Sequence, residues 1–396
     1  MRRIATYYQN DPTTTRVTLP FHSKKVVFEL YILEVPDPCK DSYFFKVWRK
    51  EVTKVILRKW LRFALCDTCI GFRETHQALQ SPEEKKKLRA AETKHYMFVK
   101  RERGAYKDRS KEAETNPERV ISIIDDGADQ GVYAAPYHCR RTHGDEQHYK
   151  IKTFLMGVIA HGRDTYAFPY LENVKHGTNM SIECLHRVLL DIYKADGKLA
   201  PKLWLQEDNT TKCCKSCYKL GYCALLVAWG LFDEVVLSFL PVGHTHEDID
   251  QFFSRLAVYL RTHHARSRKE LCQAVHDCYL SKFGKRPKTE NIDNAANISE
   301  WLEPYLNNMK QAVNRPGITN YHQFRLRRSS DGSNVHMQVR EWATTGDPWR
   351  GLQNDTSHFV VFKTVPEPQD MVDGVPPAQR KELVGGTEET NKAHMK

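Results

Sequence analysis

The feature that most constrains the fold is an apolar segment that ends in a turn rich in His and acidic residues and continues as an amphipathic helix. The apolar run covers residues 235–240 and stops at Pro241 and Gly243, and residues 243–248 read Gly-His-Thr-His-Glu-Asp. Apolar residues then recur at helical spacing, at Ile249, Phe252, Phe253, Leu256 and Leu260. A strand that leads directly into a helix is typical of open α/β sheets, which place their chemistry at such junctions.

Two further apolar runs end in acidic residues. Residues 120–124 lead into Asp125 and Asp126, and residues 203–205 lead into the acidic stretch 207–208. Hydrophobic patterning predicts strands over 120–126, 151–161, 165–170, 202–206 and 234–240, and helices that start near Ser181 and cover 215–229 and 247–262. This order predicts a ribonuclease-H-like α/β fold with a mixed sheet flanked by helices. Its three antiparallel strands are extended by parallel strands through helical crossovers.

The acidic residues at these junctions predict a divalent-metal site. A ribonuclease-H-like core carries one acid on its first strand, one at the end of the fourth and one on the helix after the fifth. Asp126, Asp208 and Asp250 occupy those places, with Asp125 and Asp129 beside the first. Two-metal phosphoryl transfer needs carboxylates around two ions about 3.5–4 Å apart. Mg²⁺ or Mn²⁺ is the expected cofactor, because both prefer oxygen ligands.

Three neighbouring residues complete the predicted carboxylate site. Glu247 lies one helical turn before Asp250 on the same side and is an auxiliary candidate. Asp248 is rotated away from the sheet, and we expect it to be solvated. Asn209 directly follows Asp208 and is a second auxiliary candidate.

Three segments, residues 124–130, 205–209 and 239–250, resemble the blocks of a family of transposon-derived proteins. The domain that these proteins share has no assigned function and is related to DDE transposases and integrases. The resemblance covers residues 63–253, and the Gly-His-Thr-His block with its following acid is the most specific part. It implies that Asp126, Asp208 and Asp250 bind the metals of a DNA nuclease or strand transferase, with His244 as a polar residue nearby.

One departure from the family supports a second hypothesis. Relatives carry an Asn-Lys-Asn-like stretch after the Asp-Asn pair, whereas residues 212–217 here read Lys-Cys-Cys-Lys-Ser-Cys. This favours a catalytically inactive protein that is retained to bind DNA or chromatin. A third, less favoured hypothesis is a metallophosphoesterase, because Gly-His-x-His also occurs in that family. Its Asp-x-His and Gly-Asn-His blocks do not occur here in the required order.

A Cys-x-x-Cys pair, Cys66 and Cys69, has the spacing of two thiolate ligands of one Zn²⁺. The family resemblance includes this block, with a His at the far end of a following helix, and so implies His95 as a third ligand. The fourth ligand stays open among His76, Cys39 and others. The alternative is a pair of free thiols.

The remaining cysteines favour a reducing compartment. The chain has eleven cysteines, an odd number, and several lie inside apolar runs. Cys214 and Cys217 repeat the Cys-x-x-Cys spacing without obvious partners, so we expect unliganded thiols. No N-terminal apolar signal and no apolar run of membrane-spanning length occur. We therefore expect a soluble intracellular protein, located in the nucleus if it acts on DNA, and homo-oligomerisation stays open.

The charge is concentrated in the first third of the chain. Residues 1–119 carry 26 Lys and Arg against 16 Asp and Glu, whereas the rest of the chain carries 34 against 33. This asymmetry predicts that the N-terminal region binds the phosphates of DNA. We expect five regions: a basic N-terminal region over 1–118, the core over 119–265, a helical extension over 266–318, a small β appendage over 319–365 and a disordered tail over 366–396.

Overall fold

The computed structural model describes residues 17–19, 24–52, 55–57, 66–128, 133–140, 150–209, 215–245, 247–309, 318, 321–352 and 356–377. The chain divides into two compact units, residues 1–64 and residues 65–396. The predicted candidate Asp129 lies outside the described residues, as does Cys214. Among the described residues, no helix combines the length and the apolar character needed to cross a bilayer.

The described residues of the first unit form the helices α2 (Lys24–Glu34) and α3 (Asp41–Glu51) and a short parallel pair of strands, β1 (Val17–Leu19) and β2 (Val55–Leu57). Residues 26–32, a segment rich in β-branched and aromatic residues, lie inside α2. Phe28 and Tyr31 lie on one face of α2 and pack on Phe44, with ring centroids 5.0 and 5.1 Å apart. Packing between helices has overridden the strand preference of the Val and Ile residues in this segment.

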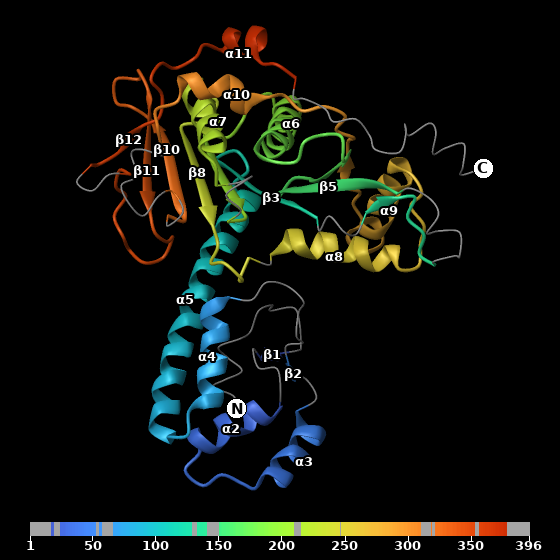
Figure 1. The fold of residues 1–396 in the computed structure, drawn as a ribbon, viewed down its shortest axis with the longest axis vertical. Helices are drawn as coiled ribbons and strands as arrows, with labels where there is room; N and C mark the ends of the chain where they lie inside the picture. Colours follow the sequence, from blue (N-terminus) through green and yellow to red (C-terminus); the bar gives the residue numbers. More distant parts are fainter. Residues whose placement is uncertain are drawn as a thin grey trace. The chain divides into compact units, whose positions relative to one another are not determined.

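The second unit is built on a ten-stranded mixed sheet (Figure 1). Its strands are β3 (Val120–Gly127), β4 (Ala134–Ala135), β5 (Ile151–Ala160), β6 (Thr165–Leu171), β7 (Lys202–Glu207), β8 (Glu234–Phe239), β9 (Lys288–Thr289), β10 (Gln323–Arg328), β11 (Val335–Arg340) and β12 (Phe359–Val360). The order across the sheet is β12-β11-β10-β8-β7-β3-β5-β6-β9, and β4 pairs with β5. β3, β5 and β6 are antiparallel neighbours, and β7 and β8 continue from β3 in parallel. The predicted order of strands and helices through this region is confirmed.

Helices cover both faces of the sheet (Figure 1). On one face α6 (Thr178–Asp196), α7 (Cys217–Ala228) and α10 (Ile298–Leu302) bury the larger apolar core. On the other face α8 (Asp248–Leu260), α9 (Arg268–Phe283) and Tyr106 of α5 (Pro82–Thr115) bury a second core. A shorter helix, α4 (Asp67–Ala78), packs beside α5. Both α4 and α5 thus belong to the same unit as the sheet, although their charge had placed them with the basic N-terminal region.

The C-terminal part of the chain continues the sheet instead of forming a sheet of its own. β10 pairs with β8, and β11 and β12 follow. In the second half of the expected helical extension, α10 ends at Leu302 and a 3₁₀ turn (Glu303–Tyr305) follows. Part of the expected disordered tail is ordered as α11 (Pro368–Gly374), and the indole of Trp229 donates a hydrogen bond to the carbonyl of Pro366 just before it. Residues 378–396 lie outside the described part of the chain.

Close approach between α8 and the sheet depends on Gly157 of β5. A Cβ atom at this position would lie 2.8 Å from the ring of Phe253 and 3.0 Å from Ile249. Gly157 pairs with Asp126 across β3 and β5, so this contact also sets the distance between α8 and the strand that carries Asp126. Glycine is required here because a larger residue would push the helix away from the sheet.

We expect Gly157→Ala to lower the free energy of unfolding by about 1–3 kcal/mol, the usual cost of overpacking a core. Gly104→Ala is the matched control. A Cβ atom added to Gly104, inside α5, would meet nothing within 4 Å, so Ala should be neutral or stabilise by up to about 1 kcal/mol. Urea unfolding of both variants measures the difference. Equal stability of the two variants would show that α8 does not rest on Gly157.

Candidate metal centre and carboxylate cleft

Four residues from three parts of the second unit form a group that can hold a metal ion. The ligand atoms of Cys66, Cys69, His95 and His244 all lie within 4.8 Å of one another. His95 Nε2 is 3.3 Å from Cys69 Sγ, 3.6 Å from Cys66 Sγ and 3.2 Å from His244 Nε2. A tetrahedral zinc site with Zn–S near 2.3 Å and Zn–N near 2.0–2.1 Å has edges of roughly 3.3–3.8 Å. The distances from His95 to the other three donors are therefore close to those of a tetrahedral site.

Local structure brings these four side chains together. Cys66 is the residue before α4, and Cys69 lies in the first turn of that helix. His95 lies on α5, which packs against α4, and His244 lies in the turn between β8 and α8. Burial lowers the pKa of His95, which favours the neutral imidazole that binds metals.

The predicted group of Cys66, Cys69 and His95 is confirmed as a possible metal site, and the structure adds the fourth ligand. Neither residue named for that place is in the group. The His76 ring lies 3.1 Å from the guanidinium of Arg89, and Cys39 belongs to the first unit. His244, which the family resemblance had placed among the carboxylates, occupies the fourth position. The two segments are 149 residues apart between His95 and His244, so local spacing could not reveal this pairing.

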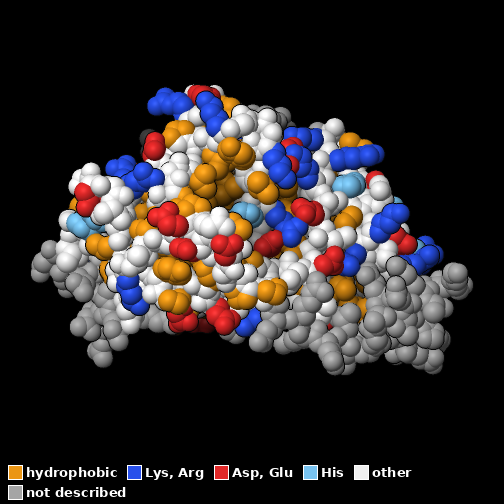
Figure 2. Space-filling view, turned by 90° about the horizontal axis from the view of Figure 1, so that it is seen from above, with side chains coloured by type: hydrophobic (Ala, Val, Ile, Leu, Met, Phe, Trp, Pro, Cys, Tyr) orange, Lys and Arg blue, Asp and Glu red, His pale blue; other side chains and the backbone are white. Residues whose placement is uncertain are grey.

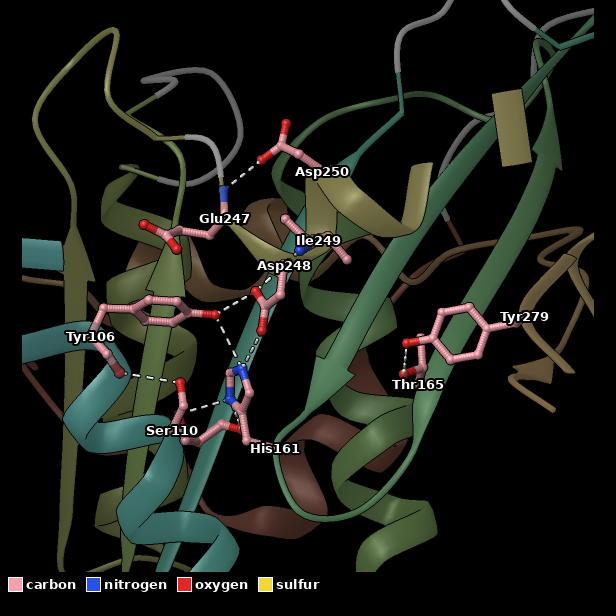
Figure 3. A network of polar contacts seen from close by, with 10 residues as sticks. Tyr106, Ser110, His161, Thr165, Glu247, Asp248, Ile249, Asp250 and Tyr279 are labelled. Carbon is pink, nitrogen blue, oxygen red and sulfur yellow. Dashed lines mark hydrogen bonds and ion pairs between the residues drawn. The ribbon is translucent and has the colours of Figure 1, made fainter. Parts of the chain in front are cut away.

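Below the Cys/His group, α5 contacts the start of α8 twice more. Arg103 donates to the carboxylate of Glu247, and the hydroxyl of Tyr106 donates to Asp248 over 2.6 Å. His161, at the end of β5, places Nε2 2.9 Å from the carboxylate of Asp248 (Figure 3). The turn that carries His244 is thus attached to α5 at three successive points.

Asp248 was expected to be solvated, and its side chain is 39% exposed, but it is also ion-paired. Its carboxylate is held by Tyr106 and His161, and the Nδ1 atom of His161 is 3.0 Å from the carbonyl oxygen of Ser122 on β3. Burial by itself would raise the pKa of Asp248, but the hydrogen bonds from His161 and Tyr106 lower it below its usual value. Asp248 therefore joins α5, β3 and α8 as a structural ion pair.

The alternation of side chains along two parallel strands sorts the acidic residues into two groups. Asp126 and Asp208 lie on the face covered by α5 and α8, and both line one pocket, whose wall also includes Asp125 and Glu207. Burial and the charges of Asp208 and Asp250 raise the pKa of Asp126 to about 8. The three predicted acids therefore act on one another at one edge of the sheet.

Asp250 reaches this edge from the first turn of α8. Its side chain accepts a hydrogen bond from the backbone N–H of Glu247, and the Glu247 side chain accepts one from the backbone N–H of Asp250. This capping box fixes the start of α8 (Figure 3). Among the described residues, the Cys/His group has all its ligand atoms within 4.8 Å of one another. The carboxylates of Asp126, Asp208 and Asp250 do not meet this distance limit, so they are more widely spaced.

The other acidic pair, Asp125 and Glu207, points to the opposite face and meets a buried lysine. Lys219 of α7 is fully buried, and its ammonium lies 2.8 Å from Glu207 and 3.5 Å from Asp125. Ser181 of α6 accepts from Lys219 over 2.7 Å and donates to Asp125 over 2.8 Å. Sequence reasoning missed this network, although a single Lys inside the otherwise apolar segment 217–228 was a signal for it.

Two further residues from the sequence analysis, Asn209 and Cys217, lie among the described residues. The side-chain amide of Asn209 donates to the carbonyl of Leu240, which ties the end of β7 to the end of β8. Cys217 is the first residue of α7.

Comparison with known proteins identifies one region of the chain. No curated protein matches the sequence. A family model described as a Domain of unknown function (DUF7869) matches residues 143–345, about half of the chain. The match includes His244, Asp208 and Asp250, whereas Cys66, Cys69, His95 and Asp126 lie before it. The chain therefore belongs to the family defined by this domain of unknown function, DUF7869.

Proposed function

We propose that this protein is a divalent-metal-dependent enzyme of the transposase and integrase type that cuts or joins phosphodiester bonds in DNA. In this proposal Asp126, Asp208 and Asp250 hold Mg²⁺ or Mn²⁺. The observation that carries it is the placement of Asp126 and Asp208 in one pocket, on the sheet face where the charge of Asp250 also acts. Carboxylates that converge in this way are the ligands that two-metal phosphoryl transfer requires.

The topology of the sheet supports the same proposal. The strand order β6-β5-β3-β7-β8, with three antiparallel strands followed by two parallel ones, is the arrangement expected of a ribonuclease-H-like core. Asp126 lies near the end of β3, Asp208 directly after β7, and Asp250 in the first turn of α8. These are the three positions at which such a core carries its metal-binding acids.

Each group of residues has a distinct role in the proposed site. The divalent ions, when bound, would activate the attacking water or 3′ hydroxyl and stabilise the leaving oxygen. The capping box of Glu247 and Asp250 fixes the third acid, and Arg103 neutralises Glu247. We propose that the ion held by Cys66, Cys69, His95 and His244 is Zn²⁺ with a structural role, because all four positions are filled by protein donors.

Asp126→Asn and Asp208→Asn test the proposal. We expect wild-type protein to melt at a higher temperature when Mn²⁺ or Mg²⁺ is added and to nick supercoiled DNA only with one of these ions. Either substitution should abolish both effects, with a rate loss of roughly 100-fold or more, because each removes a charged metal ligand. The matched control is Asp373→Asn, on an exposed residue of α11, which should behave as wild type. A wild-type protein that neither binds the ions nor cleaves DNA would contradict the proposal.

A second candidate function is DNA or chromatin binding without catalysis. The Lys-Cys-Cys-Lys-Ser-Cys sequence over residues 212–217, which replaces the polar stretch of the family, favours it. The same experiment separates the two, because an inactive protein would bind DNA with no effect of divalent ions. The metallophosphoesterase hypothesis loses support, since His244 lies with Cys66, Cys69 and His95 instead of among carboxylates.

A further inference from the structure

Two arginines at the C-terminal end of the sheet are held over one tryptophan ring. The guanidinium carbons of Arg325 on β10 and Arg340 on β11 each lie 4.4 Å from the ring centroid of Trp349. Arg325 also donates to the side-chain oxygen of Gln338 over 3.1 Å through Nε. These contacts keep two long side chains in fixed positions, which lowers the entropy cost of binding a ligand there.

The positive charges of these arginines lack close ion-pair partners within the described part of the chain. There, neither Arg325 nor Arg340 has a carboxylate oxygen within 4.0 Å, and the buried Nε of Arg340 has no hydrogen-bond partner. Glu102 is the acid whose charge acts most strongly on Arg340. Its carboxylate already accepts hydrogen bonds from the backbone N–H groups of Ala343 and Thr344. Like charges close together need an anion between them to become favourable.

A third arginine, on α5, extends this cationic group. Burial and the charge of Arg340 lower the pKa of Arg109 to about 10. Arg109 lies 4.2 Å from the Trp204 ring centroid and donates to Gln323 over 2.9 Å. The charge of Arg340 thus acts on both Arg109 and Arg325, and we call these three residues the arginine strip.

Strand register places the arginine strip on the same sheet face as the carboxylate pocket. Ile124, Gln206, Ser238, Gln323 and Arg340 are consecutive cross-strand partners from β3 to β11. Directly paired residues point to the same face of a sheet. Arg340 therefore lies on the same face as Ile124 and Gln206, which line the carboxylate pocket. Three strand spacings of about 4.8 Å separate Arg340 from the Gln206 position, or roughly 14 Å.

The opposite face of β10 and β11 is covered. Phe324, Leu326, Val335, Met337 and Val339 pack into the core that includes α7. The alternation of the strands therefore turns Arg325, Gln338 and Arg340 away from that core, beside α5. The arginine strip is accordingly a polar surface that lies next to the carboxylate pocket and not a part of the apolar core.

We propose that the arginine strip binds the phosphodiester backbone of a DNA strand and leads it to the carboxylate pocket. This inference rests on the proposed function for the destination of the strand, but the binding surface itself stands on the arginines. Planar guanidinium groups match phosphate oxygens in a two-pronged geometry. A DNA duplex rises about 3.4 Å along its axis per nucleotide of one strand, so the roughly 14 Å between the strip and the pocket corresponds to about four nucleotides of a duplex.

The chemistry of the strip favours phosphates over bases or an acidic protein. The Trp349 ring carries guanidinium groups, so cations and not a free aromatic surface are presented for binding. In contrast, the face of the molecule in Figure 2 shows Lys and Arg side chains interspersed with Asp and Glu. Binding of a backbone through the strip would not depend on base sequence, because phosphate contacts carry no direct sequence information.

The test compares DNA binding by full-length variants. Fluorescence anisotropy with a labelled DNA duplex, over a series of salt concentrations, gives the affinity and its salt slope. Arg325→Gln combined with Arg340→Gln should weaken binding by about tenfold or more and reduce the salt slope by roughly 2, because two phosphate contacts are lost. The matched control combines Arg261→Gln and Arg286→Gln, two exposed arginines whose loss changes the net charge equally. It should leave both quantities near wild type.

Further variants keep the result interpretable. Arg325→Lys combined with Arg340→Lys keeps both charges and should retain most of the salt slope, which separates lost charge from lost folding. A protein that binds DNA through the strip but shows no effect of divalent ions would overturn the proposed function alone. The inference is overturned if wild-type protein does not bind DNA, or if the Gln double variant binds with unchanged affinity and salt slope.

Discussion

Purified protein is expected to contain one zinc ion per chain, and Cys69→Ser or His244→Ala should remove it. The four ligands join α4, α5 and the turn after β8, so the ion connects segments that are far apart in the sequence. A structural zinc site contributes several kcal/mol to folding, up to about 10–16 kcal/mol in isolated zinc-finger peptides. We expect the melting temperature to fall by roughly 10–20 °C, at about 2–4 °C per kcal/mol for a unit of this size.

Metal analysis and thermal unfolding check this prediction together. Cys39→Ser and His76→Ala are suitable controls, because both residues lie outside the group and both should keep the zinc and the stability of the parent protein. The proposed zinc site is refuted if freshly purified wild-type protein contains no zinc and its two thiols at Cys66 and Cys69 react freely with an alkylating agent.

The second large effect is expected for Lys219→Met. Burial would lower the pKa of Lys219, but Asp125 and Glu207 raise it, so the ammonium stays charged inside the core. Its removal leaves two carboxyl groups buried without a cation, which typically costs about 3–5 kcal/mol. Burial and the charge of Asp125 already raise the pKa of Glu207 to about 8, so protonation of Glu207 will recover part of the loss.

Urea unfolding near neutral pH measures the effect of this substitution. Adding Asp125→Asn to Lys219→Met should restore part of the stability, because one of the two carboxyl groups left without a cation is then replaced by a neutral amide. Lys194→Met, on an exposed residue of α6, is the control and should change stability by less than about 0.5 kcal/mol. A loss below about 1 kcal/mol for Lys219→Met would mean that the network contributes little net stability.

Short-range patterns were sufficient to predict the elements of the core. Strands β3, β5, β6, β7 and β8 and helices α6, α7 and α8 follow the predicted order, because each carries apolar residues at the spacing of its element. The pattern was less reliable where a segment was short and rich in β-branched residues. Residues 26–32 form a helix because Phe28 and Tyr31 have a packing partner in Phe44, which the local sequence does not show.

The metal ligands show how far spacing alone can reach. The Cys66-x-x-Cys69 pair is a local signal, because both thiols belong to one helical turn, and His95 followed from the family pattern. His244 joins them only because α5 runs from α4 to the turn after β8, and this depends on the packing of α5 on the sheet. No sequence interval specifies that contact.

For the acidic residues too, local sequence predicted one property and tertiary structure decided another. Apolar runs and turn residues were enough to place Asp125, Asp126, Glu207 and Asp208 at the ends of two strands. Which acid of each pair faces the pocket depends on the strand register and on the helices that cover each face. Lys219 on α7 neutralises Asp125 and Glu207 on one face, while Asp126 and Asp208 meet Asp250 on the other. This outcome required the packing of the whole unit, since the alternation of a strand fixes which residues share a face but not what lies opposite them.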